Sequence, residues 1–429
     1  MKKIVCAPKR LIPQYLEADT KYFCTYSNPR RDDVGYFAPS LKKDIMLKGL
    51  TPSVPVWDFT TIALSVSAAD NSIQRRKSAD GWTRQIDLRI HLCNPSIWKP
   101  VKEDLQNTLR FLTGDFWKLK FLDEGVRPPS QINLFKEYDE DCIALLSGGI
   151  DSLAGALDLV SEHRKPLFVF QVVPGDTDTQ KKYAQKIWPG NNHCQWSHKI
   201  HRPKGESERS TRARSLIFFA FAALAASAIT PSANRPVDIF VPENGFISLN
   251  IPLHIGRIGS LSTKTTHPIY LGGIQKIWDA LALNVKLVSP YQFKTKGEIL
   301  KECKNRKLLE ELIAKSTSCG KYRPHGWQHC GRCVPCMVRR AAFKYAGISD
   351  NTEKGYKFKE LSHAERPENG ADDVGAMAIS CLKYRQYGIQ SLIGGNLSFA
   401  LPSERKEFEG VIRRGLEEVE KLLIEHKVI

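Results

Sequence analysis

Two hydrophobic periods follow one another in the first 140 residues. Thr60–Ser67 and Arg84–Leu92 alternate apolar and polar positions, a period of two that predicts strands, and the polar, glycine-containing turn between them predicts that they pair. Val101–Leu112 places leucines at helical spacing, and Phe116–Leu122 has the composition of another strand. This β-β-α-β order predicts a small N-terminal α+β domain that ends near the loop Gly125–Ser130.

From Asp141 onward, short apolar runs alternate with helical segments. The runs that predict strands are Cys142–Leu146, Leu167–Val173, Cys194–Ile200 and Val237–Val241. The segments that predict helices are Ser152–His163, Asp178–Trp188 and residues 211–229.

These strands lack polar alternation, which is typical of strands covered by helices on both faces. The order predicts an α/β fold with a doubly wound parallel sheet over residues 141–345, in which ligands bind at the carboxyl ends of the strands. Residues 346–429 are expected to form a C-terminal helical extension, with its main helices at Asp372–Tyr387 and Ser403–Lys427.

The amino-acid composition indicates the general class of protein. The chain has 429 residues, of which 42% are hydrophobic and 25% charged, as in soluble globular proteins. Its most apolar stretch, Ser215–Ile229, is too short to span a membrane, and no long apolar run follows the basic N-terminus. We therefore expect a cytoplasmic protein without a membrane span. Seven of the 11 cysteines are scattered singly, as reduced buried thiols would be.

The net charge of +17 is concentrated in the middle of the chain. Residues 141–340 hold 28 Lys and Arg against 15 Asp and Glu. Such an excess suits an anionic ligand, either a nucleotide or a nucleic acid. A solvated basic surface would give the same count, so charge alone does not separate these interpretations.

A glycine-rich motif stands where the first apolar strand meets its helix. The two glycines allow a tight turn, the helix N-terminus adds partial positive charge, and the serines add hydroxyl donors. Together they predict a cradle for phosphate, although an ordinary capped turn would need similar residues. The motif consists of Ser147, Gly148, Gly149, Ile150, Asp151 and Ser152.

Four cysteines are clustered, at Cys319, Cys330, Cys333 and Cys336. Four thiolates at this spacing are able to surround one tetrahedral zinc ion, and no open coordination position is evident, so a structural site is predicted. An iron–sulfur cluster is the main alternative, because closely spaced cysteines also hold clusters. Four unrelated thiols are the remaining interpretation.

Several single residues are candidates for the same site. Glu243 and Asn244 follow a predicted strand, where they would contact a purine-like edge or cap the next turn. His267, in a threonine-rich loop, is a candidate general base or a structural residue. Lys296 and Arg214 are candidate phosphate or carboxylate contacts, or solvated surface charges.

The glycine-rich motif resembles the pyrophosphate loop (PP-loop) of the adenine-nucleotide hydrolase-like ATP pyrophosphatases. The resemblance implies transfer of AMP from ATP with release of pyrophosphate, and nucleotide contacts from the Ser147–Ser152 loop. Arg214 is a further expected nucleotide contact, and the expected catalytic residues are Asp151, Ser152, Lys296 and His267. In that superfamily the Asp of the loop usually helps to hold Mg²⁺.

The loop and the downstream cysteine knuckle together resemble the QueC-like 7-cyano-7-deazaguanine synthases over residues 142–345. The matching segments are Arg212–Phe218, Pro290–Ile299 and Cys333–Arg340. This resemblance implies an ATP-dependent carbon–nitrogen ligase with structural Zn²⁺, Mg²⁺ and ATP as cosubstrate, acting on 7-carboxy-7-deazaguanine. Ser215 departs from the family, which prefers Asn there.

The extra residues 1–140 and 346–429 make the arrangement similar to the QatC-like branch of the family, found in the Qat antiphage defence system. That branch implies transfer of the acyl group to the N-terminal amine of a partner protein, with QatB as the expected partner. The alternatives are a free-standing nitrile synthase that uses ammonia and a tRNA-modifying PP-loop enzyme. Docking surface for a partner would come from Thr60–Ser67, Arg84–Leu92 and Ser403–Lys427, unless these pack on the catalytic domain.

Overall fold

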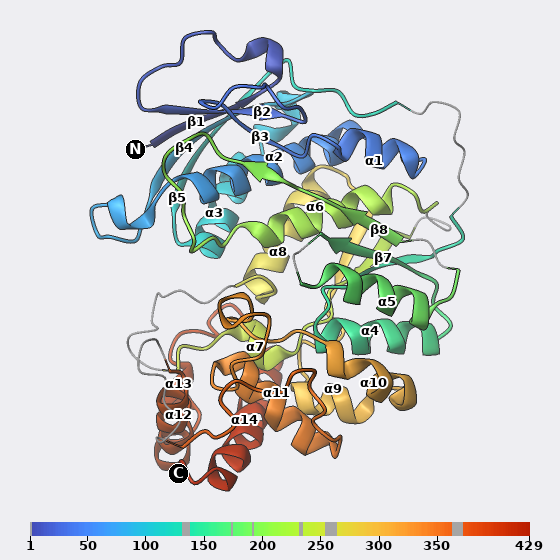
Figure 1. Ribbon diagram of the computed structural model, residues 1–429, viewed down its shortest axis with the longest axis vertical. Coiled ribbons are helices and arrows are strands. Elements are labelled where there is room, and N and C mark those ends of the chain that lie inside the picture. Colours follow the sequence, from blue (N-terminus) through green and yellow to red (C-terminus); the bar gives the residue numbers. More distant parts are fainter. Residues whose placement is uncertain are drawn as a thin grey trace.

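Two β-sheets, with helices between and below them, organise the chain (Figure 1). The computed structural model describes residues 2–130, 138–172, 175–190, 193–230, 235–253, 264–362 and 372–429. Val173, at the end of a predicted strand, lies outside these residues.

The first sheet is built mostly from the N-terminal region. Its six strands run in the order β5-β4-β1-β2-β3-β9, parallel except for β9, which pairs antiparallel with β3. The strands are β1 (Lys2–Ala7), β2 (Thr20–Thr25), β3 (Gly35–Phe37), β4 (Gln85–His91), β5 (Phe116–Leu122) and β9 (Ile200–His201). The predictions for β4 and β5 are confirmed, and β9 ties a later segment to this sheet.

The prediction of a strand at Thr60–Ser67 is wrong, because this stretch belongs to the helix α2 (Val54–Ser72). The helix is buried on all sides, so it lacks the polar stripe that marks a surface helix. The hydroxyls of Thr60, Thr61 and Ser65 donate to carbonyls one turn earlier, which satisfies them inside the core. Arg84–Leu92 therefore pairs with β1 and β5 instead.

The second sheet confirms the predicted doubly wound arrangement. Its five parallel strands run in the order β11-β10-β6-β7-β8. The strands are β6 (Cys142–Leu145), β7 (Pro166–Gln171), β8 (His193–Trp196), β10 (Val237–Phe240) and β11 (Val285–Val288). The chain order reverses between β6 and β10, which is the place where such sheets open a crevice for ligands.

Helices join the two sheets through one continuous hydrophobic core. In Figure 1, α2 and α6 lie between the sheets, and α4 and α5 lie beyond the second sheet. α2 packs on α6, and α3 packs on α8. The helices of this part are α1 (Leu41–Leu47), α3 (Lys102–Thr113), α4 (Ile150–Ser161), α5 (Thr177–Ile187), α6 (Arg214–Ala226) and α8 (Pro268–Ala280).

The remaining helices gather at the end of the molecule opposite the N-terminal sheet (Figure 1). They are α7 (Gly245–Leu249), α9 (Lys296–Glu302), α10 (Arg306–Leu312), α11 (Val334–Ala346), α12 (Val374–Tyr387), α13 (Gln390–Ile393) and α14 (Pro402–Glu425). Short 3₁₀ helices occur at Lys9–Leu11, Arg75–Lys77, Pro95–Trp98, Ile313–Lys315 and Arg323–His325.

The predicted C-terminal helices are confirmed as α12 and α14. α14 packs against α7, α9, α11 and α12, α2 is buried, and β4 lies inside its sheet. The three segments considered for partner docking therefore pack largely within the chain. Among the described helices, none combines the length and apolar character that crossing a bilayer requires.

Candidate functional site

A pocket of about 390 Å³ opens at the carboxyl ends of β6, β7 and β10. It coincides with the switch point of the second sheet, where the fold favours ligand binding. The residues around it are Leu145, Ser147, Ser152, Gln171, Asp176, Gln180, Thr211, Arg212, Arg214, Ser215, Phe218, Phe219, Val241, Pro242, Glu243, Thr265 and Thr266.

The Ser147–Ser152 loop forms one side of this pocket. Gly148 has φ +90°, a left-handed conformation that side chains rarely adopt, and it lets the chain turn from β6 into α4. The hydroxyls of Ser147 and Ser152 lie 3.1 Å apart, and the Gly149 N–H donates to Ser147 Oγ. Both serines therefore sit at the N-terminus of α4, where hydroxyl and N–H donors suit an anion.

Asp151 is not the loop residue that the motif suggests, because it is buried in the first turn of α4. Its Oδ1 accepts a hydrogen bond from Lys296 Nζ at 2.5 Å, and its Oδ2 accepts from Asn244 Nδ2 at 2.7 Å. Burial alone would raise the pKa of Asp151, but the Lys296 ammonium together with hydrogen bonds from Glu243, Lys296 and Asn244 lowers the pKa to about 2. Lys296 thus has the partner that a cation at a helix N-terminus needs.

Glu243 completes this cluster from the end of β10. Asn244 Nδ2 also donates to Glu243 Oε1, at 3.0 Å. Burial raises the pKa of Glu243 well above its ordinary value, and the Asp151 charge raises it further. Asn244 also caps α7, since its side chain accepts from Ile247 N–H. Two carboxyl groups and one ammonium group therefore meet beside the pocket. Of these three groups, the Glu243 carboxyl is the one that lines the pocket.

The remaining candidates occupy different places. Arg214 lines the pocket and is exposed at the start of α6. His267 is buried and caps α8 by accepting from Ile269 N–H, and it is not among the residues that line the pocket. Burial and the nearby charge of Lys264 lower the pKa of His267 to about 4, so its imidazole is neutral at physiological pH.

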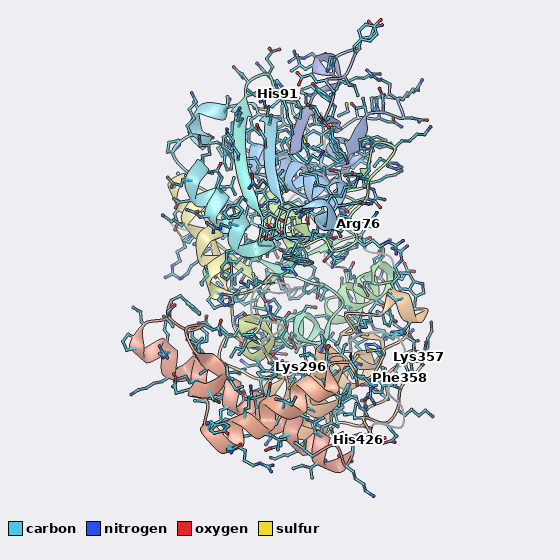
Figure 2. All side chains as sticks on the ribbon, turned by 90° about the vertical axis from the view of Figure 1, so that its left-hand side faces the viewer. Arg76, His91, Lys296, Lys357, Phe358 and His426 are labelled. Carbon is cyan, nitrogen blue, oxygen red and sulfur yellow. The ribbon has the colours of Figure 1, made fainter. Side chains whose placement is uncertain are left out.

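Figure 2 places Lys296 in the half of the molecule formed by the later helices, while Arg76 and His91 lie in the N-terminal half. Lys296 begins α9, far along the chain from the Ser147–Ser152 loop that it approaches.

The four clustered cysteines meet in one buried site. Their Sγ atoms all lie within 4.8 Å of one another, and the Cys319–Cys333 and Cys330–Cys336 pairs are 3.9 Å apart. Four sulfurs bound at about 2.3 Å to one tetrahedral ion would lie about 3.8 Å apart. The spacing fits a single zinc ion and leaves little room for a multi-iron cluster.

Backbone groups support the same interpretation. The N–H groups of Lys321 and Cys330 donate to Cys319 Sγ, and the Cys333 N–H donates to Cys330 Sγ. Such donors stabilise thiolates, the form that binds zinc. His329 takes no part, because its Nε2 accepts from Ser318 N–H.

Arg212 and Asp176 line the pocket but are not among the site residues that the sequence predicts. Asp176 stands just beyond the carboxyl end of β7, a position that could have marked it. Arg212 begins the Arg212–Phe218 segment that resembles the family, but its contacts with Asp70 and Trp82 of the N-terminal region are distant in sequence and could not be predicted.

Comparison with known proteins identifies part of the chain. Residues 268–347, which include Lys296 and the four cysteines, match the family model of the queuosine biosynthesis protein QueC. A 7-cyano-7-deazaguanine synthase of Methanocaldococcus jannaschii is 36% identical over 87 residues, which is 20% of this chain and 38% of that protein. The synthase of Paracoccus denitrificans is 34% identical over 88 residues, or 20% of this chain and 35% of that protein.

A third relative, the 7-cyano-7-deazaguanine synthase of Methanococcus maripaludis (strain DSM 14266), is 44% identical over 71 residues. That alignment covers 16% of this chain and 30% of the relative, so the chain spans only about a third of the length of the relatives it matches. The matched region leaves out the Ser147–Ser152 loop. The chain therefore contains a segment that matches the QueC family model, and it is partly homologous to 7-cyano-7-deazaguanine synthases.

Proposed function

We propose that the chain is an ATP-dependent carbon–nitrogen ligase that adenylates the carboxylate of 7-carboxy-7-deazaguanine. The observation that carries this proposal is the position of the Ser147–Ser152 loop. It lines the switch-point pocket, and Lys296 from the QueC-family segment reaches the same loop through Asp151. The loop proposed to bind phosphate and a segment similar to deazaguanine enzymes therefore meet at one site.

The reaction follows from the chemistry of an acid substrate. A carboxylate oxygen attacks the α-phosphorus of ATP, and the bond to the β-phosphate oxygen breaks to release pyrophosphate. An amine nitrogen then attacks the acyl carbon, loses a proton and displaces AMP. The hydroxyls of Ser147 and Ser152 and the N-terminus of α4 would bind the leaving pyrophosphate, where negative charge develops.

Magnesium does not fit Asp151 in the arrangement described. Lys296 donates to one carboxylate oxygen and Asn244 donates twice to the other, so a metal ion there would have to displace one of them. No step is therefore assigned to a metal bound by Asp151. In the proposed reaction Lys296 holds the Asp151 carboxylate ionised, and the pair fixes the first turn of α4 below the phosphates.

The adenylation step is tested by pyrophosphate exchange. Purified protein with ATP, magnesium and 7-carboxy-7-deazaguanine should move labelled pyrophosphate into ATP, and 7-deazaguanine, which lacks the carboxylate, should support no exchange. Pyrophosphate exchange at the same rate with and without the acid, or no exchange at all, would contradict the proposal.

The acceptor is proposed to be the N-terminal amine of a partner protein in a Qat-type defence system, with QatB as the expected partner. The amine must attack unprotonated, and a terminal amine has a pKa near 8, below that of lysine, so more of it is neutral at physiological pH. Acetylating the partner's N-terminus should abolish the deazaguanine-sized mass addition while pyrophosphate exchange continues. Unchanged addition, or efficient conversion of the acid and ammonia to the nitrile without a partner, would contradict this part.

A further inference from the structure

Arg212 is a buried cation beside the candidate pocket, and no carboxylate of the described residues forms an ion pair with its side chain. It is 6% exposed and lines the pocket together with Arg214 and Ser152. Its Nε and Nη2 are buried, and neither has a hydrogen-bond partner among the described residues. Buried guanidinium donors are normally paired, because an unpaired buried charge is costly.

The N-terminal region holds the backbone of this residue. Asp70, near the end of α2, accepts the N–H groups of Arg212 and Ala213 at 2.6 and 2.8 Å. Ala213 is the residue that precedes α6, so the Asp70 carboxylate lies at the N-terminus of that helix, where negative charge is favourable. The guanidinium of Arg212 lies 4.8 Å from the centre of the Trp82 ring, which supports it by a cation–π contact.

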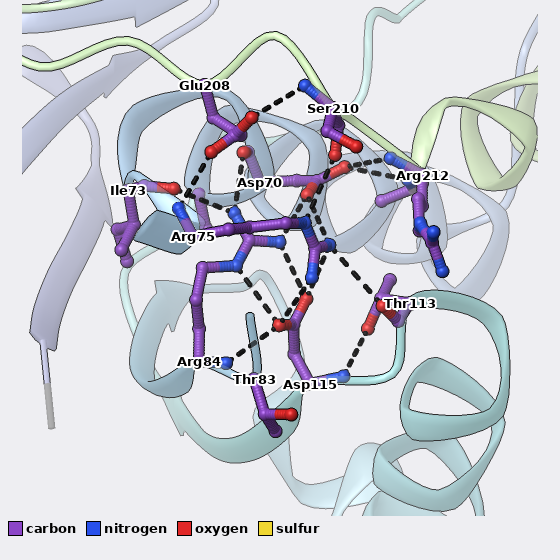
Figure 3. Close-up of polar contacts among 12 residues, drawn as sticks. Asp70, Ile73, Arg75, Thr83, Arg84, Thr113, Asp115, Glu208, Ser210 and Arg212 are labelled. Atoms are coloured by element: carbon purple, nitrogen blue, oxygen red, sulfur yellow. Dashed lines mark hydrogen bonds and ion pairs between the residues drawn. The ribbon is translucent and has the colours of Figure 1, made fainter. Parts of the chain in front are cut away.

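The surrounding charges are already used by other residues (Figure 3). Arg84 and Arg75 each bind Asp115, and Arg84 also binds Asp70. Glu208 accepts backbone N–H groups of Arg75 and Ser210. In Figure 3 the dashed lines reach the backbone of Arg212 but not its guanidinium. The buried charged groups of this cluster are therefore two carboxylates and three guanidiniums. The two carboxylates pair with Arg75 and Arg84, and the guanidinium of Arg212 has no carboxylate partner among them.

The electrostatics agree with an unmatched cation. Burial and the positive charge of Arg75 lower the pKa of Arg212 to about 10, which still leaves it protonated at neutral pH. Burial and the charge of Arg212 in turn lower the pKa of Lys264, so two cations are close enough to repel each other. An anion entering the pocket would relieve this repulsion.

We propose that Arg212 is an oxyanion-binding residue of the pocket, held in place by the buried Asp70 and the half-buried Trp82 of the N-terminal region. A planar guanidinium with free Nε and Nη2 donors is suited to a forked contact with a carboxylate or a phosphate. The anion is either the carboxylate of the acid substrate or a phosphate of the nucleotide. This inference rests on the proposed function, because it takes this pocket as the site for ATP and the acid. It also gives the N-terminal region a role, since that region positions a residue that lines the site.

Binding measurements on Arg212→Met distinguish a phosphate of the nucleotide from the carboxylate of the acid as the anion that Arg212 binds. The probes are inorganic pyrophosphate, ATP, 7-carboxy-7-deazaguanine and 7-deazaguanine, measured by titration calorimetry. The proposal predicts a loss of about 10- to 100-fold in affinity, the usual range for charged hydrogen bonds. A loss for ATP or pyrophosphate assigns a phosphate, and a loss for the acid but not for 7-deazaguanine assigns the carboxylate. Arg212→Lys should keep part of the affinity, since it retains the charge but not the fork.

Arg209→Met is the matched control. Arg209 is exposed on the same segment and lines a different opening near Arg76 and Trp82, so its loss should leave all four affinities unchanged. Thermal unfolding of the ligand-free proteins adds a second readout. Arg212→Met removes an unpaired buried charge, so its midpoint should equal or exceed that of the wild type, whereas loss of a structural arginine would lower it.

The outcomes separate the two proposals. Unchanged affinities in Arg212→Met, or a lowered unfolding midpoint without any change in binding, would overturn the oxyanion site. If the wild type bound pyrophosphate through Arg212 but neither ATP nor the acid, the oxyanion site would stand and the proposed function would fall. A wild type that bound none of the four probes would overturn both.

Discussion

Buried charges are arranged differently in the N-terminal region and around the pocket. Asp70 and Asp115 are matched by Arg75 and Arg84, with several short hydrogen bonds among them. Among the described residues around the pocket, Arg212 has no counter-ion, and Lys296 forms an ion pair with Asp151 but not with Glu243, whose pKa is raised by burial and by the Asp151 charge. Removing one partner from a matched network lowers stability, whereas an unmatched buried charge already costs stability and is expected where a ligand supplies the missing charge.

The cysteine cluster should show the largest effect, because four thiols meet there in one buried site that fits a metal ion. Purified protein should contain about one zinc per chain and be colourless, and Cys330→Ser should lose the metal and much of its soluble expression, since structural zinc contributes directly to folding. Metal analysis and solubility measure this. Cys303→Ala, at a buried thiol outside the cluster, should retain the zinc. A brown protein with broad visible absorption would favour an iron–sulfur cluster instead.

Breaking the matched network should come next in size. Arg84→Met leaves two buried carboxylates short of a partner and removes donors to the carbonyls of Asp70 and Ile73. The free energy of unfolding should fall by about 3–5 kcal/mol, the usual result of removing one partner from a buried ion pair. Denaturant titration measures it. Arg76→Met, at an exposed neighbour, should change the free energy of unfolding by no more than about 0.5 kcal/mol. A loss in Arg76→Met as large as that in Arg84→Met would contradict the special role of the buried network.

A smaller, pH-dependent effect is expected at Glu418 on α14. Its carboxylate accepts a hydrogen bond from the hydroxyl of Thr295, the residue before Lys296. Among the described residues, no cation forms an ion pair with Glu418. Burial raises the pKa of Glu418 from 4.5 to about 7. The folded protein then holds a proton that the unfolded chain releases, so stability falls as pH rises through this interval.

Glu418→Gln should remove that dependence. The variant should match the wild type near pH 4.5 and exceed its free energy of unfolding by about 1–3 kcal/mol at pH 8. Denaturant titrations at the two pH values measure the difference, and Glu407→Gln, on an exposed part of the same helix, serves as the control. A variant less stable than the wild type at pH 8 would mean that the ionised carboxylate is better compensated than its burial implies.

The sequence predicted the elements whose pattern is local. Fully apolar strands alternating with helices identified the second sheet, and the spacing of the glycines and cysteines located the loop and the cysteine cluster. It failed at α2, where burial on all sides erased the helical stripe. It also missed that Lys296 pairs with Asp151 and that Asp70 holds Arg212, because each contact joins residues more than 140 positions apart.

The account depends most on the claim that ATP is cleaved between its α- and β-phosphates in the Ser147–Ser152 pocket. The direct measurement is the product ratio when the protein turns over with ATP, magnesium, 7-carboxy-7-deazaguanine and an amine acceptor. The account predicts AMP and pyrophosphate in equal amounts, formed only when the acid is present, and loss of both in Asp151→Asn, which weakens the hold of Lys296 on α4. ADP and phosphate as the main products, or AMP formed at the same rate without the acid, would contradict it.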